Sequence, residues 1–298
     1  VLSGNLEEIG HQDLAFERSE TFVLIRSTGI SHLSDETCDA IHKLAQGWIA
    51  GTILCSLHVR SAADPLRALD TLGENPKLAE YLEQEILERL PILSHRTLTD
   101  LSILSGDFPS ALSDSILEKT DSASLLADLA ERLPMVQRRS DGEWQFHPLL
   151  ASGLSNQLRL KDSERYRSLN RRAARWFHLQ GRSEPAIRHA LEARDPEILE
   201  SVAERALQNL FRNSEFFALQ KHVRNIPPGL ARDRPFLSVF LAWALLHMGR
   251  EREGVAHLDH ARSLALDAER ESPFTGRTGS ILAHEAFLRS ILMRLQGD

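Results

Sequence analysis

Residues 135–150, MVQRRSDGEWQFHPLL, place two short runs of strand-forming residues on either side of an Asp141-Gly142 dipeptide. That dipeptide is typical of a β-hairpin closed by a type I′ turn, which requires positive φ at both central residues. Three helical patterns precede the hairpin, over residues 95–104, 109–118 and 122–132. Because three helices followed by a hairpin make a winged helix-turn-helix, we expect that fold here, with a further helix from about 148 to 160.

Helical patterns also fill the sequence before the winged helix. Ser34 is a suitable N-cap for the first of them, and Gly47 predicts a break in it. Residues 65–76, PLRALDTLGENP, have the composition of a linker. Residues 77–90 then read as one periodic helix that Pro91 ends. The apolar face of that helix is formed by Leu78, Leu82, Ile86 and Leu90.

An internal repeat marks the second half of the chain, which is helical in pattern from residue 163 onward. Residues 173–193 and 241–261 align without a gap at an offset of 68 residues, twice the tetratricopeptide period of about 34. The matched positions are Ala174, Gly181, Ala186, Ala190 and Ala193 opposite Ala242, Gly249, Gly254, Leu258 and Ala261. Small residues at these positions predict closely paired helices that stack as hairpins, with a degenerate intermediate copy near Ser214.

The composition excludes several classes of protein. No run of about 18 apolar residues could cross a membrane, and no signal-peptide pattern opens the chain. The two cysteines, Cys38 and Cys55, lack zinc-ligand spacing, which favours a reducing, cytoplasmic location without disulfides. Because the sequence starts at Val1 rather than Met, we expect it to be the middle of a longer protein.

Charge is distributed unevenly between the two halves. Residues 1–160 carry 13 Lys and Arg against 24 Asp and Glu, while residues 161–298 carry 22 against 18. Phosphate neutralisation by basic side chains supplies most non-specific affinity for DNA. An acidic first half, with the basic residues of the second half scattered along helices, therefore predicts that this chain does not bind DNA by itself.

Five motifs occur in a recognisable order. They are GNLEEIGHQDLAFERSE (4–20), QGWIAG (46–51), YLEQEILERLP (81–91), WQFHPLL (144–150) and AARWFHLQGRSEPAIRHALEA (173–193). In this order they resemble the MalT-like regulators, the large ATP-binding members of the LuxR family of transcriptional regulators. These proteins are signal-transduction ATPases with numerous domains. The resemblance covers roughly residues 1–270.

The resemblance implies a mainly α architecture. Its four parts would be a C-terminal remnant of the nucleotide-binding core (1–20), a helical lid (21–80), a winged helix with a small β-hairpin (81–160) and a tetratricopeptide-like helical-repeat sensor (161–298). No GxxxxGK[ST] loop or acidic Walker-B strand occurs in the sequence. The resemblance therefore implies ATP or ADP in the full-length protein, with none bound by this chain alone. DNA would be contacted only through a C-terminal domain outside the chain.

His147 is the first candidate site residue. It matches the histidine that such ATPases place after the wing hairpin, where the imidazole reaches the β-phosphate of ADP and clamps the inactive state. An N–H donor beside a diphosphate makes a charge-assisted hydrogen bond. Pro148 stands where the better-known motif has aspartate, so the role of that acid is not filled here. The alternative is that His147 only caps the following helix or packs against Trp144.

The second candidate is the tripeptide Gly47-Trp48-Ile49. It matches the lid position where these ATPases usually have a glycine and, two residues later, a proline that lies on the adenine; here Ile49 replaces the proline. An apolar Ile49 could still contact adenine. The alternative is a helix broken by glycine, with Trp48 in the core.

The remaining candidates favour structural roles. His257 and His260 have the spacing of two metal ligands but lack a third, so no metal site is expected. Three aromatic residues in the region of the intermediate repeat, Phe211, Phe216 and Phe217, are more typical of packing between helices than of a ligand cage. No Ser/His/Asp or Cys/His set stands out, and we expect no catalytic residues.

Two functional hypotheses remain. In the first, the chain is the regulatory portion of a LuxR/MalT-like regulator, in which nucleotide state and an effector at the repeats control a DNA-binding domain elsewhere, with possible self-association of the full-length protein. In the second, the chain is a helical-repeat scaffold for protein–protein interaction that does not depend on nucleotide. A free-standing enzyme has no supporting motif.

Overall fold

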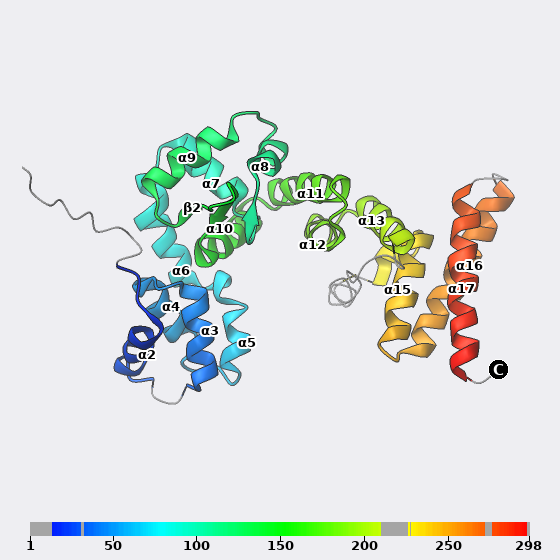
Figure 1. Cartoon of the computed structure of the whole chain (residues 1–298), viewed down its shortest axis with the longest axis horizontal. Coiled ribbons are helices and arrows are strands. Elements are labelled where there is room, and N and C mark those ends of the chain that lie inside the picture. The colour runs from blue at the N-terminus through cyan, green and yellow to red at the C-terminus, as the bar shows by residue number, and fades with distance from the viewer. Residues whose placement is uncertain (1–13, 31–32, 210–225, 227, 272–275, 297–298) are drawn as a thin grey trace, which may run out of the picture. The chain divides into compact units, whose positions relative to one another are not determined.

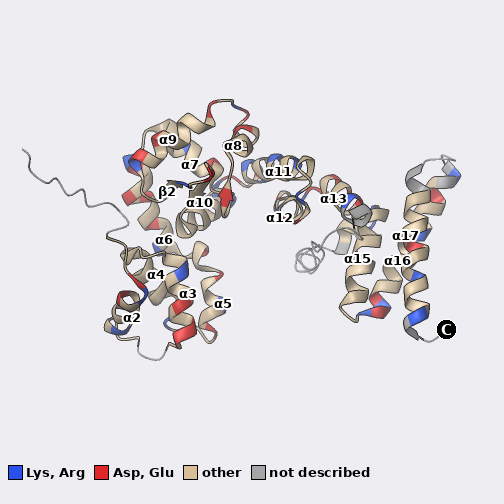
Figure 2. Ribbon diagram, in the orientation of Figure 1, with Lys and Arg blue, Asp and Glu red and all other residues tan. Residues whose placement is uncertain are grey.

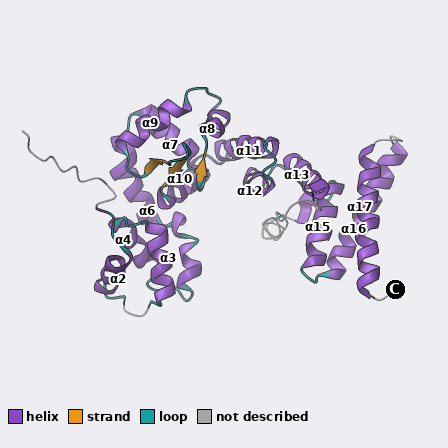
Figure 3. Cartoon of the chain, viewed as in Figure 1, coloured by secondary structure: helices purple, strands orange, loops and turns teal. Residues whose placement is uncertain are grey.

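The computed structural model describes residues 14–30, 33–209, 226, 228–271 and 276–296. The chain divides into two compact units, Val1–Leu169 and Asn170–Asp298, which are shown in Figure 1 and are described separately below. Helices dominate both units, and the only strands among the described residues belong to one small sheet (Figure 3). The expected mainly α fold class is confirmed.

The first unit begins with a group of short helices. They are α2 (Arg18–Ser27), α3 (Asp35–Ala45), α4 (Ile49–Val59), α5 (Pro65–Leu69), η1 (Leu72–Glu74) and α6 (Pro76–Tyr81). The Ser34 hydroxyl accepts a hydrogen bond from Thr37 N–H at 3.2 Å, so Ser34 is the N-cap of α3 as expected. The predicted break also occurs, because Gln46 and Gly47 have φ values of 46° and 79°.

Residues 65–76 do not form a linker, so that prediction is wrong. Asp64 and Asn75 cap the short helices α5 and α6, each of which has a proline in its first turn. Leu69 and Leu72 are buried, and η1 packs against the later helix α10 (Pro148–Lys161). Proline and glycine mark helix ends here, which is why the composition resembled that of a linker.

The predicted helix over 77–90 is helical throughout but changes its hydrogen-bonding pattern twice. After α6, residues Leu82–Ile86 form the π-helical turn η2, and Leu87–Arg89 form the 3₁₀ turn η3. Pro91 ends the run and precedes α7 (Ile92–Leu101). Leu78, Leu82 and Ile86 are buried as the periodicity predicted, while Leu90 is only half-buried.

A winged helix follows. Its elements are α7, β1 (Asp107–Phe108), α8 (Ser110–Leu117), α9 (Ser122–Arg132), β2 (Val136–Arg138), β3 (Trp144–Phe146) and α10. The antiparallel sheet has the order β1-β3-β2, with Phe108 opposite Trp144 and Val136 opposite Phe146. The core side chains Phe108 and Phe146 meet edge to face at 5.1 Å between ring centroids.

The wing turn differs from the predicted type I′ turn. Gly142 has φ 87°, but Asp141 is not among the residues with positive φ. Gly142 N–H donates to the Arg139 carbonyl at 3.0 Å, and Arg139 N–H donates to the Glu143 carbonyl at 2.7 Å. This pattern is a three-residue loop in which an ordinary turn is followed by one left-handed glycine. The hairpin was predicted correctly, whereas its loop is one residue longer than expected.

The second unit is built from helical hairpins. Its elements are the C-terminal part of α11 (Ser163–Leu179), α12 (Ser183–Ala193), α13 (Pro196–Asn209), η4 (Pro228–Ala231), α15 (Pro235–His247), α16 (Glu251–Glu271) and α17 (Gly276–Gln296). The intermediate repeat copy near Ser214 and the aromatic residues Phe211, Phe216 and Phe217 lie outside the described residues.

The two copies of the repeat close their turns in the same way. Gly181 and Gly249 have φ values of 73° and 71°. Arg182 N–H donates to the Phe177 carbonyl and Arg250 N–H to the Leu245 carbonyl, both at 2.9 Å. These are equivalent bonds of the Schellman type, 68 residues apart. The internal repeat read from the sequence is therefore a repeat in the structure.

Small residues allow these helices to pack closely. In the first copy, four of the five matched positions are buried alanines and the fifth is the turn glycine. In the second copy, Leu258 and Ala261 are buried. A Cβ on Gly254 would lie 2.7 Å from Leu246 Cδ2, so α16 needs a glycine where it approaches α15. Successive helices stack, with α12 against α13, α13 against α15, and both α15 and α16 against α17.

A buried carboxylate joins two of these helices. Glu200 on α13 is 4% exposed, and its two oxygens accept hydrogen bonds from Phe236 N–H at 3.0 Å and Leu237 N–H at 2.8 Å. These N–H groups lie in the first turn of α15, where the helix dipole favours a negative charge. Glu200 thus fixes the start of α15 against α13.

Charged residues of both signs are interspersed along the helices (Figure 2). Several form exposed ion pairs, such as Arg18 with Asp39 at 2.6 Å and Arg159 with Glu74 at 2.9 Å. Among the described residues, no helix combines the length and the apolar character needed to cross a membrane.

Candidate functional site

The turn between α3 and α4 is held by backbone hydrogen bonds on two sides. Trp48 N–H donates to the Ala45 carbonyl at 2.7 Å, and Phe16 N–H donates to the Gly47 carbonyl at 3.0 Å. A Cβ on Gly47 would lie 2.8 Å from Ala15 Cβ and 2.9 Å from the Phe16 carbonyl oxygen. Only glycine combines a left-handed φ with so close an approach of another backbone segment.

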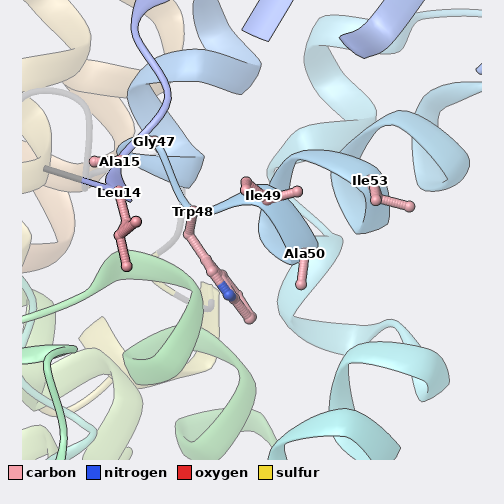
Figure 4. Close-up of a pocket in the computed structure, with 7 residues that line it drawn as sticks. All are labelled: Leu14, Ala15, Gly47, Trp48, Ile49, Ala50 and Ile53. Atoms are coloured by element: carbon pink, nitrogen blue, oxygen red, sulfur yellow. The ribbon is translucent and has the colours of Figure 1, made fainter. Parts of the chain in front are cut away.

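A pocket opens beside this turn. It is lined by Leu14, Ala15, Gly47, Trp48, Ile49, Ala50 and Ile53, with a volume of about 390 Å³. Figure 4 shows these side chains, with Leu14 on one side of the Trp48 ring and Ala50 on the other in this view. The sequence-predicted tripeptide Gly47-Trp48-Ile49 therefore lies in one pocket, which has a volume within the range of small-molecule sites.

The lining of the pocket is apolar. Ile49 is 40% exposed, so its side chain is accessible from the pocket. The described side chains that line the pocket carry no charge, so a bound group would be held by dispersion and by backbone polar groups. Such a lining suits a flat, uncharged ring.

Trp48 connects the pocket to other parts of the first unit. Its ring centroid lies 5.3 Å from that of Tyr81 at the end of α6 and 5.5 Å from that of His147. Gly51 makes room for the indole, because a Cβ there would lie 2.3 Å from Trp48 Cε3. Trp48 is half-buried: its ring packs against Tyr81 and His147 and also lines the pocket. The alternative of a Trp48 that belongs only to the core therefore describes part of its surroundings.

His147 is 6% exposed, and its backbone N–H and both ring nitrogens form hydrogen bonds. Its Nδ1 accepts from Leu149 N–H at 3.2 Å, which makes it the N-cap of α10. Its backbone N–H donates to the Met135 carbonyl at 2.8 Å. Its Nε2 lies 2.9 Å from the carbonyl oxygen of Ala45. The capping alternative is therefore observed, but the neighbouring ring is Trp48 rather than Trp144.

The structure thus brings together two motifs that are about 100 residues apart in the sequence. The wing histidine contacts the same turn that carries Gly47, Trp48 and Ile49. Sequence reasoning missed Tyr81, Leu14 and the Ala45 carbonyl. A backbone carbonyl leaves no signal in the residue type, and Tyr81 was read only as part of a periodic helix.

Comparison with known proteins matches the winged helix to a family. The MalT winged helix domain family matches residues 83–166. The chain is 25% identical over 293 residues to the HTH-type transcriptional regulator MalT of Klebsiella pneumoniae (strain 342), covering 94% of this chain and 32% of that protein. The chain contains a MalT winged helix domain and is similar to MalT along almost its whole length. It spans about a third of the length of the curated relative that it matches.

A solved structure agrees with the MalT-like fold. The crystal structure of a STAND protein (signal transduction ATPase with numerous domains) with a tetratricopeptide repeat sensor from Pyrococcus horikoshii matches with a TM-score of 0.51. The match covers 96% of this chain and 42% of that protein, at 12% identity. At this identity the likeness concerns the fold, and it extends over both units of the MalT-like chain.

Helix α10 of the MalT-like chain packs against α6 and η2. A Cβ on Gly153 would fall 2.4 Å from Leu82 Cδ1, so the helix is in close contact with η2. Gln157 donates to the Ala79 carbonyl at 3.0 Å, and Lys161 pairs with Glu83 at 3.0 Å. His147 and Lys161 thus contact other elements of the first unit from opposite ends of α10.

The candidate metal-ligand pair and the two cysteines do not line this pocket of the MalT-like chain. His260 Nε2 donates to the Arg232 carbonyl at 2.6 Å, and no cluster of three or more metal-ligating side chains occurs among the described residues. Cys38 and Cys55 are free and buried. Burial raises the pKa of the Cys55 thiol to about 12, so this thiol stays protonated and is a poor nucleophile.

Proposed function

We propose that this chain is the lid, winged-helix and sensor region of an ATP-dependent MalT-like transcription regulator. In this role it couples nucleotide state and effector binding to a DNA-binding domain outside the chain. The observation that carries the proposal is the meeting of His147 with the turn at Gly47, 2.9 Å from Nε2 to the Ala45 carbonyl. Two motifs that are about 100 residues apart in the sequence are in contact beside one apolar pocket.

The nucleotide would be ATP or ADP, with its phosphates held mainly by the P-loop of the longer protein. Gly47, Trp48 and Ile49 would contact the adenine, because their pocket is apolar, open to one side and suited to a flat ring. His147 Nε2–H would donate to a phosphate oxygen. The diphosphate would supply a negative charge. The contacts of His147 and of the pocket residues with the nucleotide would then differ between the bound and the unbound state.

The domain boundaries follow the same scheme. Residues 1–20 would end the nucleotide-binding core, 21–80 would form the lid, 81–160 the winged helix and 161–298 the sensor. The stacked hairpins of the sensor would receive a small-molecule or protein effector, and DNA would be reached only through a domain outside this chain. Self-association would belong to the full-length protein, acting in the cytoplasm. A ligand can shift such a switch only through its different affinities for the two states.

The test uses the longer protein that includes the P-loop. Isothermal titration with ADP should show that His147→Asn and Ile49→Asp each weaken binding about tenfold or more, because one removes a donor and the other charges the apolar pocket. Ile92→Asp is the matched control, since Ile92 is 88% exposed in the same unit and away from the pocket. Unchanged ADP affinity in both the His147→Asn and the Ile49→Asp variants would contradict the proposal.

A second candidate function rests on the repeats alone. The hairpins of the second unit close with their own backbone bonds and stack on one another, which is the architecture of a binding scaffold. In that case a partner of the repeats would bind equally well in the presence and absence of ADP. A partner affinity that changes with ADP favours the regulator over the scaffold.

A further inference from the structure

The Trp48 indole is the largest side chain that lines the apolar pocket, and it forms one wall of it. The backbone of Trp48 is fixed by the bond from its N–H to the Ala45 carbonyl, at 2.7 Å. Its ring leans on the following helix α4, since a Cβ on Gly51 would clash with it. Beyond that helix, the ring packs against the rings of Tyr81 and His147. Residues that do not line the pocket therefore support its Trp48 wall.

Tyr81 supports the indole from α6. The ring centroids of Tyr81 and Trp48 are 5.3 Å apart, and their planes are inclined by 58°. Aromatic pairs attract one another at centroid distances of about 4.5–7 Å. Tyr81 is half-buried, is the last residue of α6 and is not among the residues that line the pocket. An effect of Tyr81 on the pocket must therefore pass through Trp48.

The helix changes its hydrogen-bonding pattern directly after Tyr81, where the π-helical turn η2 begins. Leu82, Ile86 and Leu87 are all buried, at positions i, i+4 and i+5. In an α-helix, residues five apart point in directions that differ by about 140°, so Leu87 would point away from the side that Leu82 buries. The wider π-helical turn lets all three be buried while Tyr81 stays against Trp48.

Helix α10 holds this turn in place. Gln157, which is 9% exposed, donates from its side chain to the Ala79 carbonyl at 3.0 Å. A side-chain donor of this kind can serve a carbonyl where the regular series of helical bonds is interrupted. Gly153 leaves the space that Leu82 occupies. These contacts fix the rotation of the helix next to Tyr81, and with it the direction in which Tyr81 points.

We propose that Tyr81 is a positioning residue for the pocket. The π-helical turn sets Tyr81 against the Trp48 indole, and the indole is thereby held as the wall of the pocket. This role concerns the chain by itself. One consequence rests on the proposed function: an adenine ring should be bound less tightly when Tyr81 is removed, because only the fraction of molecules with the wall in place can bind it well.

Three substitutions at position 81 separate the aromatic ring from the helix that carries it. Tyr81→Phe keeps the ring, Tyr81→Leu keeps apolar bulk without a ring, and Tyr81→Ala removes both. Glu80→Ala is the matched control, because Glu80 is the preceding residue of α6 and is exposed. Gln157→Leu tests the turn, since it removes the donor to the Ala79 carbonyl at a place that does not line the pocket.

The first experiment is ¹⁹F NMR of the 298-residue chain labelled with fluorotryptophan. The Trp48 signal is assigned by its absence in Trp48→Phe. Tyr81→Ala and Tyr81→Leu should shift this signal and leave those of the two tryptophans in the second unit in place. Tyr81→Phe and Glu80→Ala should keep the wild-type signal, whereas Gln157→Leu should shift it.

A Trp48 signal that stays at its wild-type position in both Tyr81→Ala and Tyr81→Leu would overturn the proposal. So would a shift in Tyr81→Phe as large as that in Tyr81→Ala. A signal that moves in Tyr81→Ala but not in Gln157→Leu would overturn the part assigned to the π-helical turn. If the substituted chains do not fold, the wild-type chain decides: nuclear Overhauser contacts between the rings of Trp48 and Tyr81 are expected, and their absence contradicts the positioning role.

The second experiment is isothermal titration with ADP of the longer protein that includes the P-loop. Tyr81→Ala should weaken binding by about three- to tenfold, the effect of losing one aromatic contact, and Tyr81→Phe should match the wild type. Unchanged affinity beside a shifted Trp48 signal would overturn the link between the wall and binding. If the longer protein does not bind ADP but the Trp48 signal responds as expected, the positioning role stands and the proposed nucleotide function fails.

Discussion

Gly153 of α10 lies against Leu82 at the first position of the π-helical turn, so closely that a Cβ on Gly153 would fall 2.4 Å from Leu82 Cδ1. Both residues are fully or almost fully enclosed, and Leu78 lies 3.3 Å from the same point. The contact fixes where α10 can pack against the π-helical turn η2. An extra atom here has no space unless the buried Leu82 side chain, or one of the two helices, shifts.

Gly153→Ala should therefore lower the free energy of unfolding of the first unit by about 1–3 kcal/mol, the usual effect of overpacking. Urea denaturation followed by circular dichroism measures it. Gly279→Ala is the matched control, since Gly279 is also a helical glycine but has nothing within 4 Å of its added Cβ. That control should be neutral or stabilising by up to about 1 kcal/mol, because alanine favours the helix. Equal effects of the two substitutions would contradict the tight contact.

Gly47 and Gly106 provide a second comparison. Their φ values are 79° and 77°, so alanine is similarly strained in backbone conformation at either position. A Cβ on Gly47 meets Ala15 and Phe16, whereas a Cβ on Gly106 meets nothing within 4 Å. Gly47→Ala should cost about 1–3 kcal/mol more than Gly106→Ala in thermal or urea unfolding. Similar losses would mean that the contact of residues 15–16 with the pocket turn contributes little.

Glu200→Gln tests the carboxylate that holds the start of α15. The amide has one oxygen and one NH₂ group, so one of the two N–H donors of Phe236 and Leu237 would face another donor. We expect the second unit to lose about 1–3 kcal/mol of unfolding free energy. Glu197→Gln, an exposed acid on the same helix, should change it by less than about 0.5 kcal/mol. A neutral Glu200→Gln variant would show that the buried charge is dispensable.

The stability of the second unit should depend on pH through His189. Burial lowers the pKa of His189 to about 3, and its ring stacks on Phe177 and bonds Asn170 Oδ1 through Nδ1 at 2.8 Å. The unfolded chain binds a proton at this residue below pH about 6.5, and the folded chain does so only near pH 3. Stability is therefore present above pH 6.5 and falls by up to about 1.4 kcal/mol per pH unit as the pH decreases toward 3.

Urea unfolding of the chain at pH 7, 6 and 5 measures this dependence. His189→Gln should flatten it in the transition of the second unit, since glutamine does not titrate. Because Asp195 and other carboxylates titrate in both proteins, the difference between wild type and variant isolates His189. His95→Gln, in the first unit, should leave that transition as it is. An unchanged slope in His189→Gln would contradict the buried, neutral imidazole.

Much of the fold follows from local patterns in the sequence. Ser34, Gly47 and Pro91 mark helix ends where hydrogen bonding and φ require them, and all three do so in the structure. The glycines at 181 and 249 revealed the repeat because only a left-handed residue closes such a turn. These features depend on a few neighbouring residues, and for that reason the sequence is enough to predict them.

Features that depend on distant contacts were not predictable in this way. Strand β1 has two residues, too few for any alternation to show, and it exists because β3 offers it a partner. The π-helical turn at Leu82–Ile86 has the apolar spacing of an ordinary helix. At the candidate site, Gly47 and His147 were found through their motifs. Their contact through the Ala45 carbonyl was not, because a backbone acceptor is the same in every residue.

The matching turns at Gly181 and Gly249 have a consequence for how such a protein can change its size. Each of these two hairpins is closed by hydrogen bonds inside its own turn. Duplicating or deleting a hairpin would therefore leave the turns of the neighbouring hairpins intact. A gene could lengthen or shorten this half of the molecule in whole steps and alter what it recognises without rebuilding the first half.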